Sequence, residues 1–235
     1  MSLGIVLKSD AIFIADSHYP HYGDDLVSIL RAIIEDKFHT PQLFLMGDIF
    51  DLLFGYNEYI KSFSQNAINI INELSKKIEI YYIEGNHDFC LKDIFPHVKV
   101  FSRIEQPIKA IIEDKEFFLS HGDKYETTLS YNIYSYLMRN RVALTLLKPF
   151  EKRIIDKELK KLNQKNICTD FKMVGEHIAK IIKFYPKNSH IIEGHFHVGK
   201  KCDNYTSLPS LVCQKQVGIL KDKEIEFLDI SKILD

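Results

Sequence analysis

Cysteine is scarce in this sequence, and its spacing argues against the usual cysteine-based sites. The chain has 235 residues and only four cysteines, Cys90, Cys168, Cys202 and Cys213, with no C-x-x-C pair among them. This pattern disfavours a disulfide framework and a cysteine zinc site. We therefore expect small, reduced cysteines that pack in the core, as is usual for a protein of the cytoplasm.

Long apolar runs and strong net charge are also missing. No stretch approaches the roughly 18 apolar residues of a membrane span, and no secretion-signal pattern is found, so we expect a cytoplasmic protein. The formal net charge is −1, which disfavours a general binder of polyanions, and we expect no nucleic-acid partner. The charge is nevertheless uneven. Residues 124–187 carry 14 basic and 6 acidic residues, whereas the remainder carries 17 basic and 26 acidic ones.

Short apolar runs alternate with helical patterns in the first half of the chain. Runs at 11–15, 42–46 and 78–83 predict buried strands, and apolar residues at helical spacing predict helices over 24–37 and 58–77. This order indicates an α/β fold with parallel neighbouring strands. Further, partly antiparallel strands are predicted at 98–101, 107–113, 116–120, 189–193, 207–214, 216–220 and 224–228.

Between these two sets of strands the pattern becomes helical, with almost no glycine. We interpret residues 125–187 as a basic, apolar helical insertion, or lid. The flanking segments, 1–124 and 188–235, are then the first and second parts of one core.

Residue types that bind metals follow directly on five of the predicted strands. The segments are Asp16-Ser17-His18, Gly47-Asp48-Ile49-Phe50-Asp51, Gly85-Asn86-His87-Asp88, His121-Gly122-Asp123 and Gly194-His195-Phe196-His197. Because ligands of open α/β sheets bind beyond the carboxyl ends of the strands, we expect these segments to converge on one site. Their glycines would let the backbone turn sharply and approach closely.

The chemistry of these segments predicts two metal ions. Carboxylate, imidazole and amide oxygen without thiolate suit manganese, iron or zinc. In extended chain, Asp16 and His18 would point to the same side and could hold one ion, as would His195 and His197. The ligands exceed the need of one ion, so we expect two, with Asp48 as the bridge.

The motifs D-x-H, G-D-x-x-D, G-N-H-D, H-G-D and G-H-x-H resemble those of the calcineurin-like metallophosphoesterases. The resemblance implies a layered α/β/α core of mixed sheets flanked by helices, and two divalent ions, for which manganese is our first choice and iron or zinc the alternatives. It implies one ion held by Asp16, His18, Asp48 and His197, and another held by Asp48, Asn86, His121 and His195.

The same resemblance implies a reaction. Metal-activated water would attack phosphorus in line, and His87 would act as general acid or oxyanion stabiliser, oriented by Asp88. The other histidines match no motif, and we expect them at the surface or behind the ligands.

The insertion is the part from which we expect substrate contacts. Its apolar, aromatic helical pattern bracketed by basic residues suits a lipid-bearing anionic substrate or an anionic membrane surface. We expect Tyr125, Arg139, Arg141 and Arg153 to bind substrate. The alternative is a helical hairpin that packs on the core and has a solvated basic face.

Within the family, G-D-I-F-D-L-L and E-G-N-H-D-F, with a helical insertion after H-G-D, resemble the UDP-2,3-diacylglucosamine pyrophosphatases of lipid A synthesis. This implies hydrolysis to UMP and 2,3-diacylglucosamine 1-phosphate, by a peripheral protein on the cytoplasmic face of the inner membrane. The chain departs from that pattern at His87, where those enzymes carry arginine, and it lacks their acidic cluster after H-G-D. A phosphoesterase for a soluble nucleotide, phosphodiester or phosphoprotein, and a non-catalytic scaffold, remain as alternatives.

Overall fold

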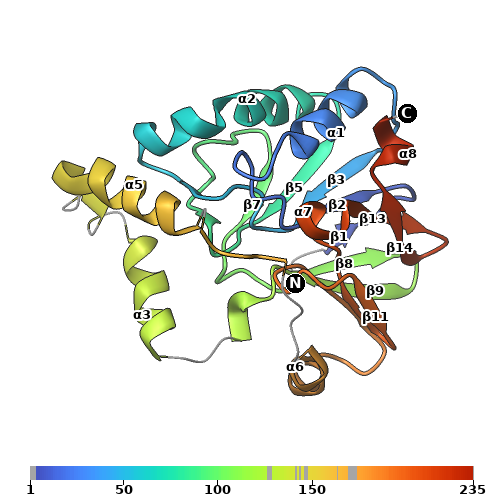
Figure 1. Ribbon diagram of the computed structural model, residues 1–235. Helices are drawn as coiled ribbons and strands as arrows, with labels where there is room; N and C mark the ends of the chain where they lie inside the picture. Colours follow the sequence, from blue (N-terminus) through green and yellow to red (C-terminus); the bar gives the residue numbers. More distant parts are fainter. Residues whose placement is uncertain are drawn as a thin grey trace.

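The computed structural model describes residues 4–125, 129–140, 142, 144–145, 148–162, 164–168 and 174–234. Its centre is a pair of six-stranded sheets (Figure 1). The first sheet has the order β14-β13-β2-β3-β5-β7. Its strands are β2 (Ile12–Ile14), β3 (Gln42–Leu45), β5 (Glu79–Ile83), β7 (Lys99–Phe101), β13 (Gln216–Lys221) and β14 (Glu224–Asp229). From β2 to β7 all neighbours are parallel, as predicted for β2, β3 and β5, and β13 and β14 form an antiparallel hairpin.

The second sheet has the order β1-β8-β9-β10-β12-β11. Its strands are β1 (Ile5–Val6), β8 (Ile108–Ile112), β9 (Lys115–Ser120), β10 (His190–Glu193), β11 (Lys200–Cys202) and β12 (Tyr205–Ser207). Strand β10 pairs in parallel with β9, although 69 residues separate their nearest ends, so the second part of the chain completes the sheet of the first. A separate two-stranded ladder joins β4 (Leu53–Phe54) and β6 (Asp88–Phe89).

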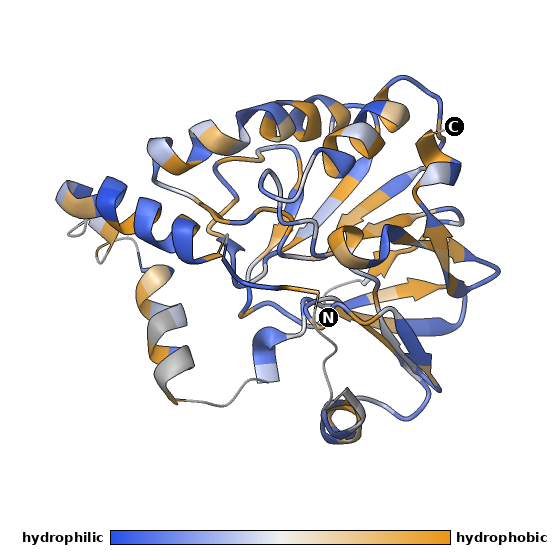
Figure 2. Ribbon diagram, in the orientation of Figure 1, coloured by the Kyte–Doolittle hydropathy of each residue, from blue (hydrophilic) through white to orange (hydrophobic). Residues whose placement is uncertain are grey.

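The two sheets pack face to face, with helices outside them. Between the sheets, Phe13 stacks on Phe44 and Phe44 on Tyr81, at ring-centroid distances of 4.6 and 4.7 Å, and Phe117 and Leu119 join them from the second sheet. Helices α1 (Asp25–Ile34), α2 (Glu58–Leu74) and α8 (Ser231–Leu234) lie on the outer side of the first sheet. Strand residues are accordingly apolar at these interfaces (Figure 2). The predicted layered core of mixed sheets flanked by helices is confirmed, with two sheets as its middle layer.

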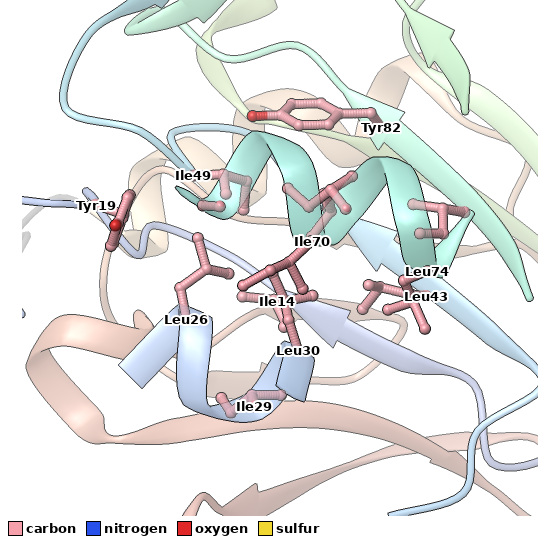
Figure 3. Packing of buried hydrophobic residues seen from close by; sticks show 14 of the residues in the cluster. Ile14, Tyr19, Leu26, Ile29, Leu30, Leu43, Ile49, Ile70, Leu74 and Tyr82 are labelled. Atoms are coloured by element: carbon pink, nitrogen blue, oxygen red, sulfur yellow. The ribbon is translucent and has the colours of Figure 1, made fainter. Parts of the chain in front are cut away.

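The layer between α1, α2 and the first sheet is the largest apolar cluster. Leu26 and Leu30 of α1 and Ile70 of α2 pack over Ile14 and Leu43 (Figure 3). These positions recur every three or four residues on the helices, which is the spacing of one buried helical face. Burial of each such side chain contributes about 2 kcal/mol to the free energy of unfolding. This layer therefore supports the strands that lead to the carboxyl edge of the first sheet.

The described part of the predicted insertion is helical. It contains η1 (Asp123–Tyr125), α3 (Leu129–Met138), η2 (Lys148–Phe150), α5 (Glu151–Leu162), α6 (Val174–Ile181) and η3 (Ile182–Phe184). Helix α5 contacts the start of α2, because Asn57 and Tyr59 donate hydrogen bonds to Glu151 and Asp156 at 2.9 and 2.7 Å. Helix α6 instead packs with Ile178 and Ile181 on the outer face of the second sheet. The boundaries of the insertion stay a prediction.

One expectation about secondary structure and one about the cysteines are wrong. The predicted strand 207–214 ends at Ser207, and helix α7 (Leu211–Gln214) follows, because Pro209 interrupts the ladder and the Ser210 hydroxyl accepts the amide N–H of Cys213 at the helix start. The cysteines are not all reduced, since Cys168 and Cys213 form a disulfide. Their 45-residue separation gave no spacing signal, because the pair is brought together only when the chain returns from the insertion to the core.

Candidate metal centre

The five predicted segments lie together at the carboxyl ends of their strands. Three of them follow β2, β3 and β5 of the first sheet, and two follow β9 and β10 of the second. Because the two sheets are packed face to face, their carboxyl ends meet at one edge of the molecule, where the ligand side chains converge.

Six of the predicted ligands form two clusters. In the first, one donor atom each of Asp16, His18 and His197 lie within 4.8 Å of one another, and His197 Nε2 is 3.3 Å from Asp16 Oδ1. In the second cluster, one donor atom each of Asp48, His121 and His195 likewise lie within 4.8 Å of one another.

Further contacts complete the second cluster. His121 Nε2 lies 3.5 Å from Asp48 Oδ2 and 3.2 Å from His195 Nδ1. Asn86 Oδ1 is 3.1 Å from the same His121 nitrogen. Apart from Asp48 in the first set, each predicted ligand set is thus brought together. The role of Asp48 as a bridge between two ions stays a prediction.

Backbone conformation places these ligands in a way that the sequence did not indicate. Asp16, His18, Asp48, His195 and His197 all have positive φ, between 42° and 67°. The segments are therefore not extended chain, in which alternate side chains point to the same side. His195 and His197 accordingly point into different clusters rather than to one ion. Left-handed backbone at a residue other than glycine costs about 1 kcal/mol or more, and such strain gathers at functional sites.

Two glycines make room for this arrangement, as expected. A side chain at Gly47, which has φ of +85°, would overlap the ring of His121. A side chain at Gly85 would overlap both the carboxylate and the backbone nitrogen of Asp48. The backbone of the loops after β3 and β5 thus packs directly on the candidate ligands, at Gly47 on His121 and at Gly85 on Asp48.

Backbone carbonyls orient two of the imidazoles. His121 donates from Nδ1 to the carbonyl of Met46 at 3.0 Å, and His197 donates from Nδ1 to that of Ile167 at 2.9 Å. Each bond keeps a proton on Nδ1 and turns Nε2 toward its cluster, which is the usual arrangement behind metal-binding histidines.

The two buried carboxylates of the site favour the binding of cations. The side chains of Asp16 and Asp48 are 0% and 3% exposed, and the ion-pair partners that we find for them among the described residues are imidazoles. Burial raises the pKa of Asp48, but His121 and His87 outweigh it and hold the pKa well below its usual range. Burial lowers the pKa of His121, but Asp48 outweighs it, so this pKa lies well above normal. At His18 burial prevails and lowers the pKa to about 3.

A donor set of this kind fits two divalent ions of the hard-to-borderline type. It offers carboxylate and amide oxygens together with imidazole nitrogens, in two groups. An ion at the second cluster would replace the proton that His121 holds against Asp48, so metal binding should release protons.

His87 lies beside both clusters and has a different orientation from the one expected. Its Nδ1 donates to the backbone carbonyl of Asp51 at 2.8 Å, and its Nε2 is 3.9 Å from Asp48 Oδ2. The ring is 5.2 Å from that of His18, centroid to centroid, and it lines the cleft described below. Nε2 is therefore the atom that can exchange a proton with a bound molecule.

Asp88 does not orient His87, contrary to expectation. Its buried carboxylate accepts the backbone N–H groups of Asp48, Ile49 and Gly85 at 3.1, 2.7 and 2.8 Å, and the Tyr82 hydroxyl at 2.6 Å. Asp88 thus ties the loop after β3 to the loop after β5. Sequence spacing alone placed it beside His87, whereas its side chain points the other way, into the protein.

Replacing Asp88 with alanine should lower the free energy of unfolding by about 4 kcal/mol, because four buried N–H groups, that of Phe50 included, and a phenol lose their acceptor. Urea denaturation followed by circular dichroism measures this change. Asp93→Ala is the matched control, since Asp93 is exposed in the same segment and should change the value by less than about 0.5 kcal/mol. Equal midpoints for Asp88→Ala and the unmutated protein would contradict the assigned role.

The metal clusters open into a cleft of about 320 Å³. Most of the predicted metal ligands, which belong to the core, line this cleft. The insertion contributes Leu162, Lys165, Asn166 and Ile167 to the lining. A second cleft, of about 390 Å³, lies next to it and shares four lining residues with it, namely Asn86, His87, Leu162 and Lys165. Its wall is mainly apolar and includes Leu52, Phe54, Phe89, Met138, Ile154 and Ile155.

The predicted substrate-binding residues are not brought together. Arg139 lines the second cleft and donates from Nη2 to the carbonyl of Gly85 at 2.8 Å. Tyr125 stacks on Phe184 at 5.0 Å, on the outer side of the second sheet, and is absent from the described lining of both clefts. Arg153 is exposed on α5 and also absent from that lining, and Arg141 lies outside the described residues.

Sequence reasoning missed Tyr22, Lys165 and Asn166, which line the metal cleft. Lys165 stands where the two clefts meet, and its backbone carbonyl accepts the Tyr22 hydroxyl at 3.0 Å. The basic excess of the insertion was a signal for Lys165, but it did not single out one residue among fourteen.

Comparison with known proteins identifies the family. The family model for calcineurin-like phosphoesterases matches residues 11–199. The chain therefore belongs to the calcineurin-like phosphoesterase family.

Several relatives carry the name UDP-2,3-diacylglucosamine hydrolase. The Shewanella piezotolerans protein is 26% identical over 113 residues, which are 48% of this chain and 47% of that protein. The Porphyromonas gingivalis protein is 29% identical over 60% of this chain and 56% of that one, and the Aliivibrio fischeri protein is 23% identical over 67% and 69%. The chain spans about half the length of the first curated relatives that it matches.

Two solved structures are also similar. A dimetal phosphatase from Danio rerio has 12% identity and a TM-score of 0.45, with 93% of this chain and 95% of that one covered. A protein of unknown function from Aquifex aeolicus has 15% identity and a TM-score of 0.43, with 83% and 82% covered.

Proposed function

We propose that this protein hydrolyses the pyrophosphate bond of UDP-2,3-diacylglucosamine, giving UMP and 2,3-diacylglucosamine 1-phosphate. The observation that carries the proposal is the direct junction of an apolar cleft with the metal cleft, across Asn86, His87 and Lys165. A substrate whose phosphates lie at the clusters can extend an acyl chain along Phe54, Phe89 and Ile155 without leaving the protein. The names of the relatives support the same substrate.

The basic groups around the junction suit a diphosphate. Lys165 lines both clefts, and Lys161 and Arg139 line the apolar one close to it. Their positive charges would hold the non-bridging oxygens and the sugar phosphate, while the ligand carboxylates stay paired with the ions. Divalent ions, with manganese as our choice, supply Lewis acidity and make water nucleophilic at neutral pH. His87 would hold a proton at Nε2 for the leaving oxygen.

The insertion also supports contact with a lipid surface. Helix α3 exposes Leu129, Ile133, Tyr136 and Leu137, which are 49–74% accessible and follow helical spacing. Helix α5 is mostly hydrophilic and rich in lysine (Figure 2). An apolar helical face beside a basic one suits peripheral binding to an anionic membrane, here the cytoplasmic face of the inner membrane. Within the described residues, no helix is long and apolar enough to span a bilayer.

The test is release of UMP from UDP-2,3-diacylglucosamine by manganese-loaded protein in detergent, beside hydrolysis of bis-p-nitrophenyl phosphate. Ile154→Glu places a charge in the apolar cleft, so we expect kcat/KM for the lipid substrate to fall at least about tenfold, with little change for the chromogenic ester. Lys157→Glu is the control, because Lys157 is exposed on the same helix and absent from the described lining of the cleft.

Hydrolysis of the chromogenic ester without release of UMP would keep the phosphoesterase and contradict the lipid substrate. It would favour the alternative of a soluble phosphoester. Equal losses on both substrates for Ile154→Glu would contradict the role of the apolar cleft.

A further inference from the structure

The disulfide between Cys168 and Cys213 stands directly behind the first metal cluster. It joins the loop 164–168 of the insertion to helix α7 of the core, across 45 residues of chain and with the Cα atoms 5.3 Å apart. Cys168 is exposed and Cys213 is half-buried, so the bond can be reached from solvent. Neither residue belongs to the motifs that define the family's site.

Both ends of this bond contact the ligand His197 or its support. The Nδ1 of His197 donates to the carbonyl of Ile167, the residue before Cys168, and lies 3.7 Å from Cys213 Sγ. The opposite nitrogen, Nε2, faces Asp16 at 3.3 Å. The disulfide therefore holds the carbonyl of Ile167 in place, and this carbonyl in turn orients the imidazole of His197.

Helix α7 supports the same cluster from the core. Gln214 donates to the backbone carbonyl of His197 at 2.8 Å, and the Ser210 hydroxyl donates to that of Asp16 at 2.9 Å. The disulfide thus attaches the loop to the element that holds the cluster in place.

The same loop forms one wall of the metal cleft, through Lys165, Asn166 and Ile167. Apart from the disulfide, the hydrogen bonds that we find between its described residues and the core come from Tyr22 and His197. The loop is largely exposed, and few of its apolar atoms are buried against the core. Segments held by so few contacts open at low free-energy cost, so the covalent bond decides how firmly this wall stays closed.

We propose that Cys168–Cys213 is a reversible redox-modification site that sets the metal affinity of the Asp16–His18–His197 cluster. A dithiol reductant attacks one sulfur as a thiolate and breaks the S–S bond, and its second thiol then displaces the mixed disulfide. Two electrons and two protons pass to the protein, which gains two thiols, while the reductant becomes a disulfide. Exchange with a disulfide oxidant reverses the step.

The reduced state follows from the contacts. Loop 164–168 is then released from α7, the carbonyl of Ile167 no longer fixes His197, and the cleft loses a wall. Groups that orient a metal-binding histidine typically change metal affinity tenfold or more when removed. Disulfides of cytoplasmic proteins are as a rule transient and redox-sensing, which suits a bond at this place.

This inference rests on the metal centre of the proposed function, and its test needs no substrate. Metal-free protein is titrated with Mn²⁺ after oxidation by glutathione disulfide or after reduction by a phosphine that is then removed, and free Mn²⁺ is read by electron paramagnetic resonance. We expect reduction to weaken one of two binding steps by about tenfold. Cys168→Ser and Cys213→Ser should have the weak value under both conditions, whereas Cys202→Ser, which removes an exposed free thiol, should respond like the unmutated protein.

Two further readouts separate the outcomes. Thiol titration in denaturant should show two free thiols after oxidation and four after reduction, and amide exchange in residues 164–168 should quicken on reduction. Four thiols after oxidation, or equal Mn²⁺ affinity in both states, would overturn the inference and leave the metal centre standing. Absence of Mn²⁺ binding in both states would overturn the centre and the inference together.

Discussion

Asp48→Ala should lower kcat/KM for phosphoester substrates by about a thousandfold or more, which corresponds to about 4 kcal/mol of transition-state stabilisation. Asp48 is the carboxylate of the second cluster, 3.5 Å from His121, and its charge also acts on His18 of the first. Without it, the second cluster keeps two imidazoles and the Asn86 amide but no anionic ligand. Steady-state hydrolysis of bis-p-nitrophenyl phosphate measures the loss.

The metal content of the same variant tests whether Asp48 bridges two ions. A bridging carboxylate predicts that dialysed Asp48→Ala protein loses most of both ions, whereas a ligand of the second cluster alone predicts the loss of one. Elemental analysis distinguishes these results, with Asp93→Ala as the control that should keep activity and metal. Full activity with full metal content in Asp48→Ala would contradict the two-metal scheme.

Folding is not expected to confound this measurement. The bonds that hold the loop after β3 use the backbone of Asp48 and Ile49, which donate to Asp88, and alanine preserves both. The acceptor that is lost is Asp48 Oδ1, which receives the backbone N–H of His87 at 2.9 Å. A thermal unfolding curve close to that of the unmutated protein should therefore accompany the loss of activity.

The convergence of the candidate ligand residues could be predicted from the sequence, because strand order and chemistry point to the same edge of the sheets. Each motif follows a buried apolar run that forms a strand. Because parallel strands end at the same edge of a sheet, residues that directly follow such strands lie close together in the fold. The hydrophobic pattern of α1 and α2 likewise determines which helix faces cover the sheet. These inferences need only local periodicity and the rules of chain connection.

What could not be predicted depends on contacts between distant segments. The left-handed backbone of Asp16 and His197 has no sequence signal, since residues other than glycine adopt it only where the surrounding structure supports it. The carbonyl that orients His87 belongs to Asp51, a bond that carries no sequence signal because every residue has a carbonyl. The Cys168–Cys213 pair and the place of Lys165 depend on how the insertion returns to the core.

His87→Ala is expected to keep both ions and to slow hydrolysis by about a hundredfold or more, the range of a general acid or of an oxyanion stabiliser. The imidazole of His87 belongs to neither cluster, and the bond from its backbone to Asp48 survives the substitution. The effect should fall on kcat, with metal content unchanged by elemental analysis. His39→Ala, at an exposed site between α1 and β3, should change neither quantity.

The leaving group decides between the two roles of His87. A general acid at Nε2 matters most when the departing oxygen is basic, so His87→Ala should lose more activity on a phenyl phosphodiester than on a p-nitrophenyl one. Stabilisation of the phosphoryl oxygens would instead give similar losses on both esters, because those oxygens are the same. Loss of an ion along with the activity would contradict both roles and make His87 a support of the Asp48 carboxylate, 3.9 Å from its Nε2.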